Sequence, residues 1–428
     1  MSTIWQKRAY ILMGLLASGI VLVWGMTRPP HFAIDDAYIT YRYAENLRQG
    51  IGFVYNAGES VLGTTAPMYA ILLALLSYLV PDFVLLGHWF SILAWGGAAL
   101  MTLPLLLKLN RPLAAAIAPV LIAVQPTILK SVGMETPFLL FMMLLVAWSW
   151  LDGRKKTAVI AGAITLITRQ DSALWLLVLG FAVWQQKKEL PWREAVGVMA
   201  LTLPWFAFAA WQYGSILPNS ASAKIGQTNV MVVGSGIPFW QQFGLLLTEH
   251  ELPLIGILVV VALLAWLREA ATSRHWTGWW LSVWVLGYTA VYSLLNVVNF
   301  NWYFVPPVAV TMLLAAIGLE VIYGWAQQLI GHQKWQLAQV GVILIALLFI
   351  PLIVSLGLKT WNTNQIPGVR ADYFEIGRWL AENSEPEDMV ATIEIGVIGY
   401  ESKRPIVDTM GLVSSGMTNH QVGWVETL

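Results

Sequence analysis

The chain of 428 residues contains no cysteine, and only 11% of its residues are charged. Without cysteine it has no disulfides, no thiolate nucleophile and no cysteine metal site. The low charge excludes an ordinary soluble domain, in which about a quarter of the residues are charged. A hydrophobic content of 57% and a mean hydropathy of +0.65 indicate a polytopic membrane protein.

Other absences narrow the function. The formal net charge is zero, so no overall field attracts nucleic acid. No glycine-rich loop leads into Lys-Ser or Lys-Thr, which argues against nucleotide-driven transport by this chain. The six histidines are scattered without ligand spacing, so a histidine metal site is not expected. The first apolar run lacks a small-residue cleavage site and is interpreted as a retained membrane helix.

The apolar runs predict an all-α membrane domain with about 11 transmembrane helices. Lys7 and Arg8 precede the first run, so the positive-inside rule places the N-terminus in the cytoplasm. Residues 68–80 form a helix of only about 20 Å, too short to cross, and are interpreted as an outer juxtamembrane helix. The predicted spans are 9–26, 83–107, 113–129, 137–151, 157–168, 172–184, 195–213, 252–267, 279–298, 304–325 and 335–358.

The first outer segment, IDDAYITYRYAENLRQGIGFVYNAGESVLGTTAP (34–67), is the longest polar stretch before the later spans. Two adjacent acids, Asp35 and Asp36, open a helical pattern that ends at Gly50. An extended piece at 51–55 and a turn at 56–58 are expected to follow. One aspartate could simply cap the helix, but a single cap does not account for the second acid.

The chain divides into a transmembrane domain, 1–358, and a small extracytoplasmic α/β segment, 359–428. In this segment the pattern predicts a helix at 373–383 and short strands at 389–395 and 405–408. Gly396, Gly399 and Gly411 are interpreted as turns.

The predicted topology gathers polar residues on the outer side of the membrane. Ionisable groups at membrane level are costly and usually functional. A carboxylate there can take a proton from a hydroxyl, and cations can hold a leaving phosphate. These groups suit sugar transfer from a polyprenyl phosphate by one inverting displacement. The candidates are the acids Asp35, Asp36, Glu135 and Asp171, the cations Arg42, Lys130, Arg169 and Lys224, and the polar residues Asn219 and Tyr303.

Each candidate has a simpler interpretation. Glu135 could favour a helix N-terminus through the dipole, and Arg42 could pair with Glu45 one turn away. Arg169 and Asp171 could form a structural pair between two spans. Lys224 could be a solvated loop residue, and Tyr303 an aromatic of the membrane interface.

Residues 35–67 resemble the first outer loop of the C-type (GT-C) membrane glycosyltransferases, and most closely the branch of the mycobacterial terminal arabinofuranosyltransferase. Further elements follow in the same order: SVGMETP (131–137), TRQD (168–171), YGSILPNSASAK (213–224) and EIGVIGYESKRPIVDTMGLV (394–413). The chain departs from this branch at Gly63-Thr64-Thr65, where an aromatic and a tryptophan usually follow the first threonine, and at Gln170, where proline is usual.

The resemblance implies that Asp36 or Asp35 is the catalytic base and that Glu135 is the acid of the second outer loop. Arg42, Tyr41, Arg169, Asp171, Asn219, Lys224 and Tyr303 are the expected substrate-binding residues. The expected partners are a polyprenyl-phosphate sugar donor, an envelope glycan, lipid or protein acceptor, and membrane lipids. No cofactor is required, although a pyrophosphate donor would favour a divalent cation.

The expected location is a bacterial-type plasma membrane, with a cytoplasmic N-terminus and an extracytoplasmic C-terminus. Two other classes remain open. A lipid-linked sugar transporter would spread ionisable residues through the membrane midplane. A subunit of an envelope complex would tolerate replacement of Asp35 and Asp36.

Overall fold

A computed structural model describes residues 3–219, 237–247, 253–272, 278–295, 299–330 and 371–414. The predicted span 335–358 and Lys224 lie outside the described residues.

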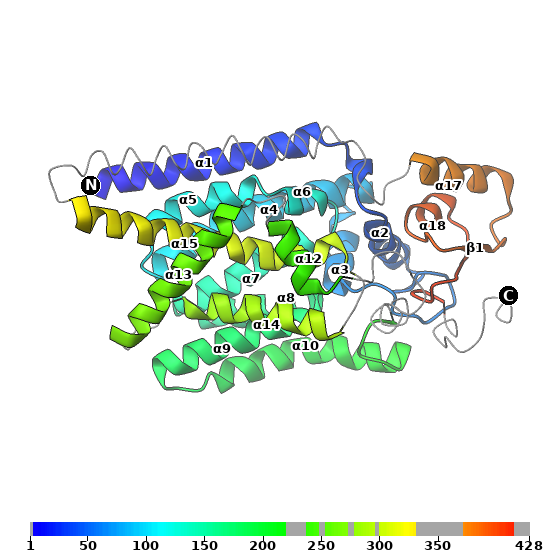
Figure 1. The fold of residues 1–428 in the computed structure, drawn as a ribbon. Helices are drawn as coiled ribbons and strands as arrows, with labels where there is room; N and C mark the ends of the chain where they lie inside the picture. Colours follow the sequence, from blue (N-terminus) through cyan, green and yellow to red (C-terminus); the bar gives the residue numbers. More distant parts are fainter. Residues whose placement is uncertain are drawn as a thin grey trace.

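The described chain is a bundle of roughly aligned helices with a small α/β segment at one end (Figure 1). Five described helical stretches are long and apolar enough to cross a membrane, and shorter apolar helices pack between them. The bundle helices are α1 (Thr3–Thr27), α4 (Phe83–Lys108), α5 (Pro112–Ala123), α7 (Thr136–Leu151), α8 (Lys155–Thr168), α9 (Ala173–Lys187), α10 (Trp192–Tyr213), α13 (Pro253–Thr272), α14 (Trp279–Leu295) and α15 (Val305–Ile330).

Short helices gather at the end of the bundle that carries the α/β segment. They are η1 (Pro30–Phe32), α2 (Asp35–Arg48), α3 (Pro67–Leu76), α6 (Pro126–Lys130), η2 (Gln170–Ser172), α12 (Phe239–Leu245) and η4 (Asn301–Phe304). With 10 residues, α3 is about 15 Å long, which agrees with its interpretation as a helix that does not cross. Residues 51–55 form bends in place of the predicted extended piece.

The predicted span 113–129 is two helices. Pro126 starts α6, and Gln125 before it has an extended backbone with ψ 114°. The ring of a proline disfavours a helical conformation in the preceding residue, which explains the break. α5 and α6 together still form one apolar stretch, Pro112–Lys130, long enough to cross.

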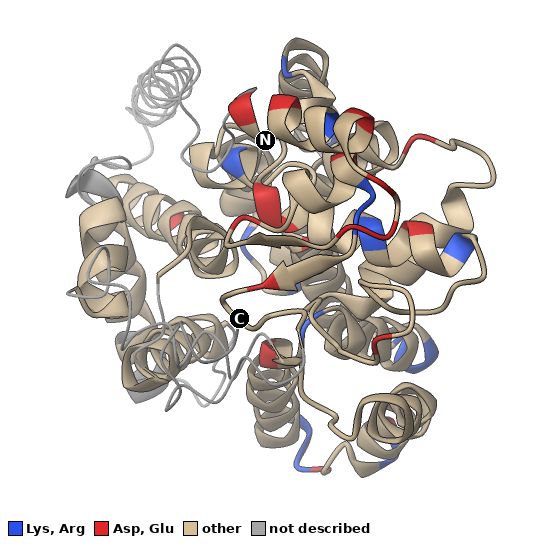
Figure 2. Ribbon diagram, turned by 90° about the vertical axis from the view of Figure 1, so that its right-hand side faces the viewer, with Lys and Arg blue, Asp and Glu red and all other residues tan. Residues whose placement is uncertain are grey.

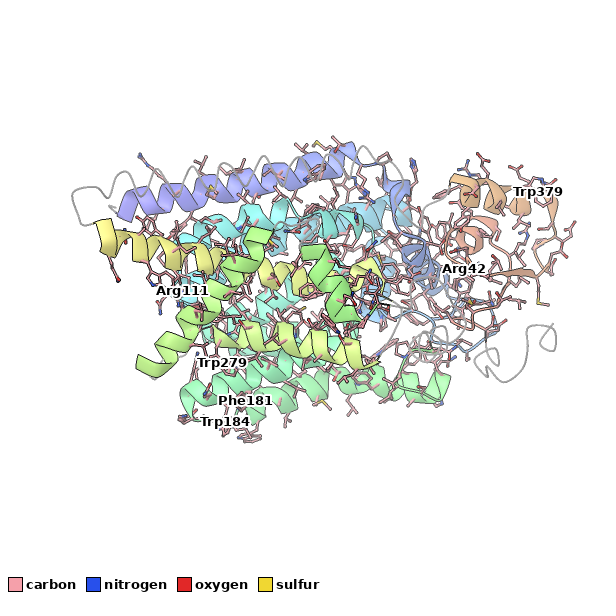
Figure 3. The ribbon with its side chains drawn as sticks, in the orientation of Figure 1. Arg42, Arg111, Phe181, Trp184, Trp279 and Trp379 are labelled. Carbon is pink, nitrogen blue, oxygen red and sulfur yellow. The ribbon has the colours of Figure 1, made fainter. Side chains whose placement is uncertain are left out.

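Ion pairs show which loops share an end of the bundle. Lys108 lies 2.5 Å from Asp152, and Arg154 lies 2.6 Å from the same carboxylate. Lys155 lies 2.7 Å from Glu194. The loops after α4, α7 and α9 therefore lie at the same end of the bundle. This agrees with the prediction that residues 68–80 do not cross the membrane, since that prediction places these loops on one side. Arg111, Phe181, Trp184 and Trp279 lie toward this end, whereas Arg42 and Trp379 lie toward the other (Figure 3).

The opposite end brings four distant segments together. The Tyr41 hydroxyl of α2 donates to the Gly133 carbonyl at 2.7 Å. The Asn219 side chain donates to the Gly411 carbonyl at 2.6 Å, and its backbone N–H donates to the Leu62 carbonyl at 2.8 Å. The loop after α1, the loop before α7, the segment after α10 and the C-terminal segment thus meet at one end.

The C-terminal segment consists of α17 (Ala371–Asn383), β1 (Val390–Thr392), α18 (Val397–Ser402) and β2 (Ile406–Asp408). The strands pair in parallel, with Val390 opposite Ile406. They lie near the middle of this end of the molecule, with acidic and basic residues around them (Figure 2). The predicted turn at Gly399 is wrong, because this glycine lies within α18.

Helices α13 and α15 cross with backbones almost in contact at Gly318. An added Cβ there would lie 2.0 Å from the Leu258 carbonyl oxygen. Small residues at such crossings let membrane helices approach closely. The backbone of α13 has no flexible side chain to move aside at this point.

We expect Gly318→Ala to destabilise the bundle by about 1–3 kcal/mol, because it overpacks this crossing. SDS titration in mixed micelles, followed by tryptophan fluorescence, would measure the change. Gly324→Ala on the same helix is the matched control, since an added Cβ there meets nothing within 4 Å. Equal stability of the two variants would contradict the close crossing.

Candidate functional site

The first aspartate of α2 is bound to the C-terminal segment. Asp35 Oδ2 accepts from the Gly396 N–H at 2.9 Å, and Oδ1 accepts from the Val397 N–H at 2.7 Å. The N-cap position of α2 itself is Ile34 and has no side-chain cap. Asp35 does accept hydrogen bonds from N–H groups at the start of a helix, as the capping interpretation predicted. The helix is α18, however, and not α2, on which Asp35 lies.

Burial sets the protonation of this acid. Asp35 is 7% exposed. Burial raises the pKa of Asp35 to about 7, the two backbone hydrogen bonds oppose the rise, and the neighbouring charge of Asp36 adds to it. A pKa near neutrality suits a general base, but both oxygens of Asp35 are already bound. Geometry is the first requirement for proton transfer.

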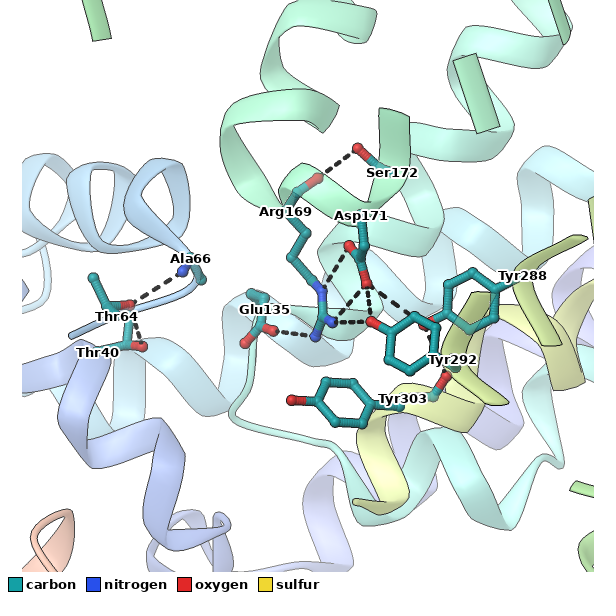
Figure 4. A network of polar contacts seen from close by, with 10 residues as sticks. All are labelled: Thr40, Thr64, Ala66, Glu135, Arg169, Asp171, Ser172, Tyr288, Tyr292 and Tyr303. Atoms are coloured by element: carbon teal, nitrogen blue, oxygen red, sulfur yellow. Dashed lines mark hydrogen bonds and ion pairs between the residues drawn. The ribbon is translucent and has the colours of Figure 1, made fainter. Parts of the chain in front are cut away.

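Asp36 is half-buried, and Thr40 lies one turn further along α2. The Thr40 and Thr64 hydroxyl oxygens are 3.1 Å apart, and Thr64 Oγ1 accepts from the Ala66 N–H at 3.1 Å (Figure 4). A pair of hydroxyls that bond each other uses one of its two hydrogens. The other has no partner among the described residues.

The loop before α7 joins α2 to the next candidate acid, Glu135. The hydroxyls of Tyr41 and Tyr69 donate to the Gly133 carbonyl at 2.7 and 3.2 Å. Gly133 has φ +97°, and an added Cβ would lie 2.6 Å from the Cβ of Ala33. Only glycine fits both the backbone angle and the space, which places Glu135 close to the start of α2.

Glu135 belongs to a buried group around Arg169, here named the arginine cluster: Glu135, Arg169, Asp171, Tyr288, Tyr292 and Tyr303 (Figure 4). Arg169 lies 3.1 Å from the Glu135 carboxylate and 2.7 Å from that of Asp171. Its guanidinium stands 5.1 Å over the Tyr303 ring. The cation therefore has two acids and one aromatic face, and the pairing of Arg169 with Asp171 predicted as an alternative is present.

Two tyrosines of α14 complete the arginine cluster. The Tyr292 hydroxyl donates to Asp171 Oδ2 at 2.5 Å, and the Tyr288 hydroxyl lies 3.5 Å from the same oxygen. Their rings stack with centroids 4.5 Å apart. The sequence interpretation missed both residues. Their spacing of one helical turn, with a polar hydroxyl on each, was the available signal.

Other predicted binding residues have backbone partners. The guanidinium of Arg42 is buried and donates to the carbonyls of Tyr55, Gly399 and Arg404. Arg42 does not pair with Glu45, which binds Lys403 instead. Glu135 occupies the N-cap position of α7 but makes no capping bond there. The structure thus groups Glu135, Arg169, Asp171 and Tyr303, and places Arg42, Tyr41 and Asn219 between segments of the chain.

No group of three or more potential metal ligands lies together within the described ranges. One cavity of about 460 Å³ lies between α5, α13 and α15, beside Arg111 and Glu320. This cavity is at the end of the bundle away from the arginine cluster. None of the residues predicted for the site lines it.

The arrangement defines a membrane protein of the GT-C fold, with buried acids and an arginine at one end. It is similar to the apo oligosaccharyltransferase of Archaeoglobus fulgidus, with a TM-score of 0.64, 13% identity, and coverage of 95% of this chain and 65% of that one. ArnT from Cupriavidus metallidurans bound to undecaprenyl phosphate gives a TM-score of 0.61 at 13% identity, with coverage of 95% and 86%. These likenesses establish the fold.

A second structure of the archaeal enzyme AglB, in complex with an inhibitory peptide and a dolichol-phosphate, matches with a TM-score of 0.65 at 13% identity, covering 94% of this chain and 64% of that one. The chain therefore spans less than two thirds of the length of this enzyme. A family model described as "Domain of unknown function (DUF8728)" matches residues 360–428. No curated protein sequence matches the chain.

We expect Arg169→Met to destabilise the protein by about 3–5 kcal/mol, because it leaves the buried carboxylate of Glu135 and the half-buried carboxylate of Asp171 without a counter-ion. SDS titration would measure the loss. Arg154→Met, which removes an exposed ion pair at the other end, is the control and should leave stability unchanged. A similar result for both variants would show that the arginine cluster is not a buried ion network.

Stability should also depend on the protonation of Asp35. Because its folded-state pKa of about 7 lies above the ordinary value of 3.8, the ionised acid is disfavoured in the folded protein. The associated stability is present below about pH 4 and is lost as the pH rises through 7. Thermal unfolding between pH 4 and 8 should show this decline in the wild type and a smaller one in Asp35→Asn. Parallel curves would contradict the raised pKa.

Proposed function

We propose that the protein is a membrane glycosyltransferase that moves a sugar from a polyprenyl-phosphate donor to an acceptor hydroxyl. The GT-C fold supports the class. The fold matches include one structure with dolichol-phosphate and one with undecaprenyl phosphate, which supports a lipid-phosphate donor. The observation that carries the proposal is that the half-buried acid Asp36, in the first turn of α2, and the buried arginine cluster lie at the same end of an apolar bundle.

Asp36 is the proposed base. Both oxygens of Asp35 accept backbone hydrogen bonds from Gly396 and Val397, which makes Asp35 the poorer candidate of the two acids for meeting an acceptor. Asp36 takes the proton of the acceptor hydroxyl while the oxygen of that hydroxyl attacks the anomeric carbon of the donor sugar. The bond from that carbon to the phosphate oxygen breaks, and the lipid phosphate leaves with its electron pair. One displacement inverts the anomeric centre.

The arginine cluster is the proposed phosphate site. A phosphate is an anion that charge-assisted hydrogen bonds to arginine hold strongly, and Arg169 is already ordered by Glu135, Asp171 and the Tyr303 ring. The hydroxyl hydrogen left by Thr40 and Thr64 suits a sugar oxygen. Lys224, outside the described residues, is retained as a further candidate for the phosphate.

A transporter of lipid-linked sugars fits the charges less well. Helices α5, α7 and α14 contain no Asp, Glu, Lys or Arg, and in α4 and α8 such residues stand only at a terminus. Such a transporter is expected to place ionisable groups at the membrane midplane. The distribution of charge at the ends favours chemistry at one face.

The finer identity follows from the sequence resemblance. We propose an extracytoplasmic site, a cytoplasmic N-terminus and an acceptor that is an envelope glycan, lipid or protein. The arabinofuranosyl branch is the first choice for the sugar. The differences at Gly63-Thr64-Thr65 and Gln170 lie close to the site, so a different sugar is the second choice.

Purified protein in lipid, supplied with a panel of polyprenyl-phosphate sugars and acceptor glycans, should release lipid phosphate from one donor. Asp36→Asn should lower the rate by about 10²- to 10⁴-fold, because it removes the base. Glu59→Gln, at a half-buried acid of the same loop, should keep wild-type activity. Equal release by wild type and Asp36→Asn would remove the base from the mechanism and favour a carrier or subunit.

A further inference from the structure

The C-terminal segment is bound to the first outer loop by buried hydrogen bonds. The Tyr55 hydroxyl donates to the Ile395 carbonyl. The Asn56 side chain exchanges two bonds with the backbone of Ile406, donating to the carbonyl at 2.8 Å and accepting from the N–H at 3.0 Å. Because both hydrogen bonds are made to the backbone of one residue, the Asn56 side chain fixes the position of β2 against the loop.

Arg42 adds three more buried bonds to this contact. Its guanidinium donates to the carbonyl of Tyr55 in its own loop and to those of Gly399 and Arg404 in the C-terminal segment. It also stands 4.4 Å over the Tyr55 ring.

Two glycines of the segment leave no room for a side chain. A Cβ on Gly396 would lie 2.0 Å from the Asp35 carbonyl oxygen and 2.4 Å from Oδ2. A Cβ on Gly399 would lie 2.0 Å from the Tyr55 hydroxyl. The turn at Gly396 therefore rests directly on the start of α2, where the two acids stand.

We propose that the C-terminal segment is a working part of the active site, in which Asp35 acts as a positioning residue. The segment holds Asp35 by the amides of Gly396 and Val397 and so fixes the first turn of α2. Asp36, the next residue, then points in a set direction toward the acceptor. This inference rests on the proposed function and gives a role to the region that matches a domain of unknown function.

The arrangement also explains why two adjacent acids are present. Successive side chains on a helix point about 100° apart, so one acid can face the C-terminal segment while the other faces away. The segment does not need to contact the donor, because the described arginine cluster is built from Glu135, the α8–α9 connection, α14 and η4. Loss of the hydrogen bonds between the segment and Asp35 should therefore lower the rate of sugar transfer and leave donor binding unchanged.

The test compares variants of the full-length protein in lipid. Gly396→Ala should lower kcat on the order of 10- to 100-fold, since small misplacements of reacting groups cost this much. The donor KM should stay within about threefold, because uniform binding is unaffected. Glu45→Gln is the matched control. It removes the exposed Lys403 ion pair between the same two parts of the chain and should leave kcat unchanged.

Asp35 is tested by a conservative pair, which also covers the case in which Gly396→Ala fails to fold. Asp35→Asn keeps an acceptor oxygen for one amide and should retain a measurable kcat. Asp35→Ala should lose more than Asp35→Asn, and Asp36→Asn should show the loss of about 10²- to 10⁴-fold expected for the base. If Asp35→Asn is as inactive as Asp36→Asn, or if Gly396→Ala keeps its kcat, the proposal is overturned. A rise in donor KM at constant kcat would also overturn it.

Hydrogen exchange supplies a readout that needs no activity. The backbone amides of Gly396 and Val397 should exchange slowly in wild type and in Asp36→Ala, and faster in Asp35→Ala. Equal exchange in all three would show that Asp35 does not hold the segment. A wild type that transfers no sugar from any donor would instead count against the proposed function, so the two failures are distinguishable.

Discussion

An arginine buried in an apolar bundle must be paired, and this requirement organises the described end of the molecule. Arg169 is 6% exposed, and an isolated charge at such a place costs several kcal/mol. This cost is offset by two carboxylates, one tyrosine hydroxyl and one aromatic face, which come from four separate elements. Each of these elements must therefore place its contacting residue at the level of Arg169 in the bundle. The positions of α7, η2, α14 and η4 follow from one charge.

Much of the fold could be predicted from the sequence, because long apolar runs interrupted by charges have few solutions in a membrane. The helices from α4 to α10 begin and end within a few residues of the predicted spans. The short α3 is consistent with the side assigned to each loop. The predictions that were wrong are local: Pro126 divides one span, residues 51–55 form bends, and Gly399 stands within a helix.

The site was harder to predict, because its contacts join residues far apart in the chain. Sequence reasoning picked out Glu135, Arg169 and Asp171 by their charge at a membrane boundary. It missed Tyr288 and Tyr292, since tyrosines in an apolar helix usually mark an interface. It assigned Arg42 to phosphate, whereas its partners are three carbonyls, two of them supplied by residues more than 350 positions later. Local pattern holds no information about such pairs.

The bond between Asp35 and Gly396 spans 361 residues of chain, which has a consequence for biogenesis. Synthesis at about 5–20 residues per second separates the emergence of the two partners by roughly 20 to 70 s. During that time the loop after α1 is complete while its partner is still being made. Asp35 and Arg42 then lack the backbone groups of the C-terminal segment that hold them. The acids reach their final geometry only after the C-terminal segment is made, so a nascent chain carries these residues without the arrangement of the folded protein.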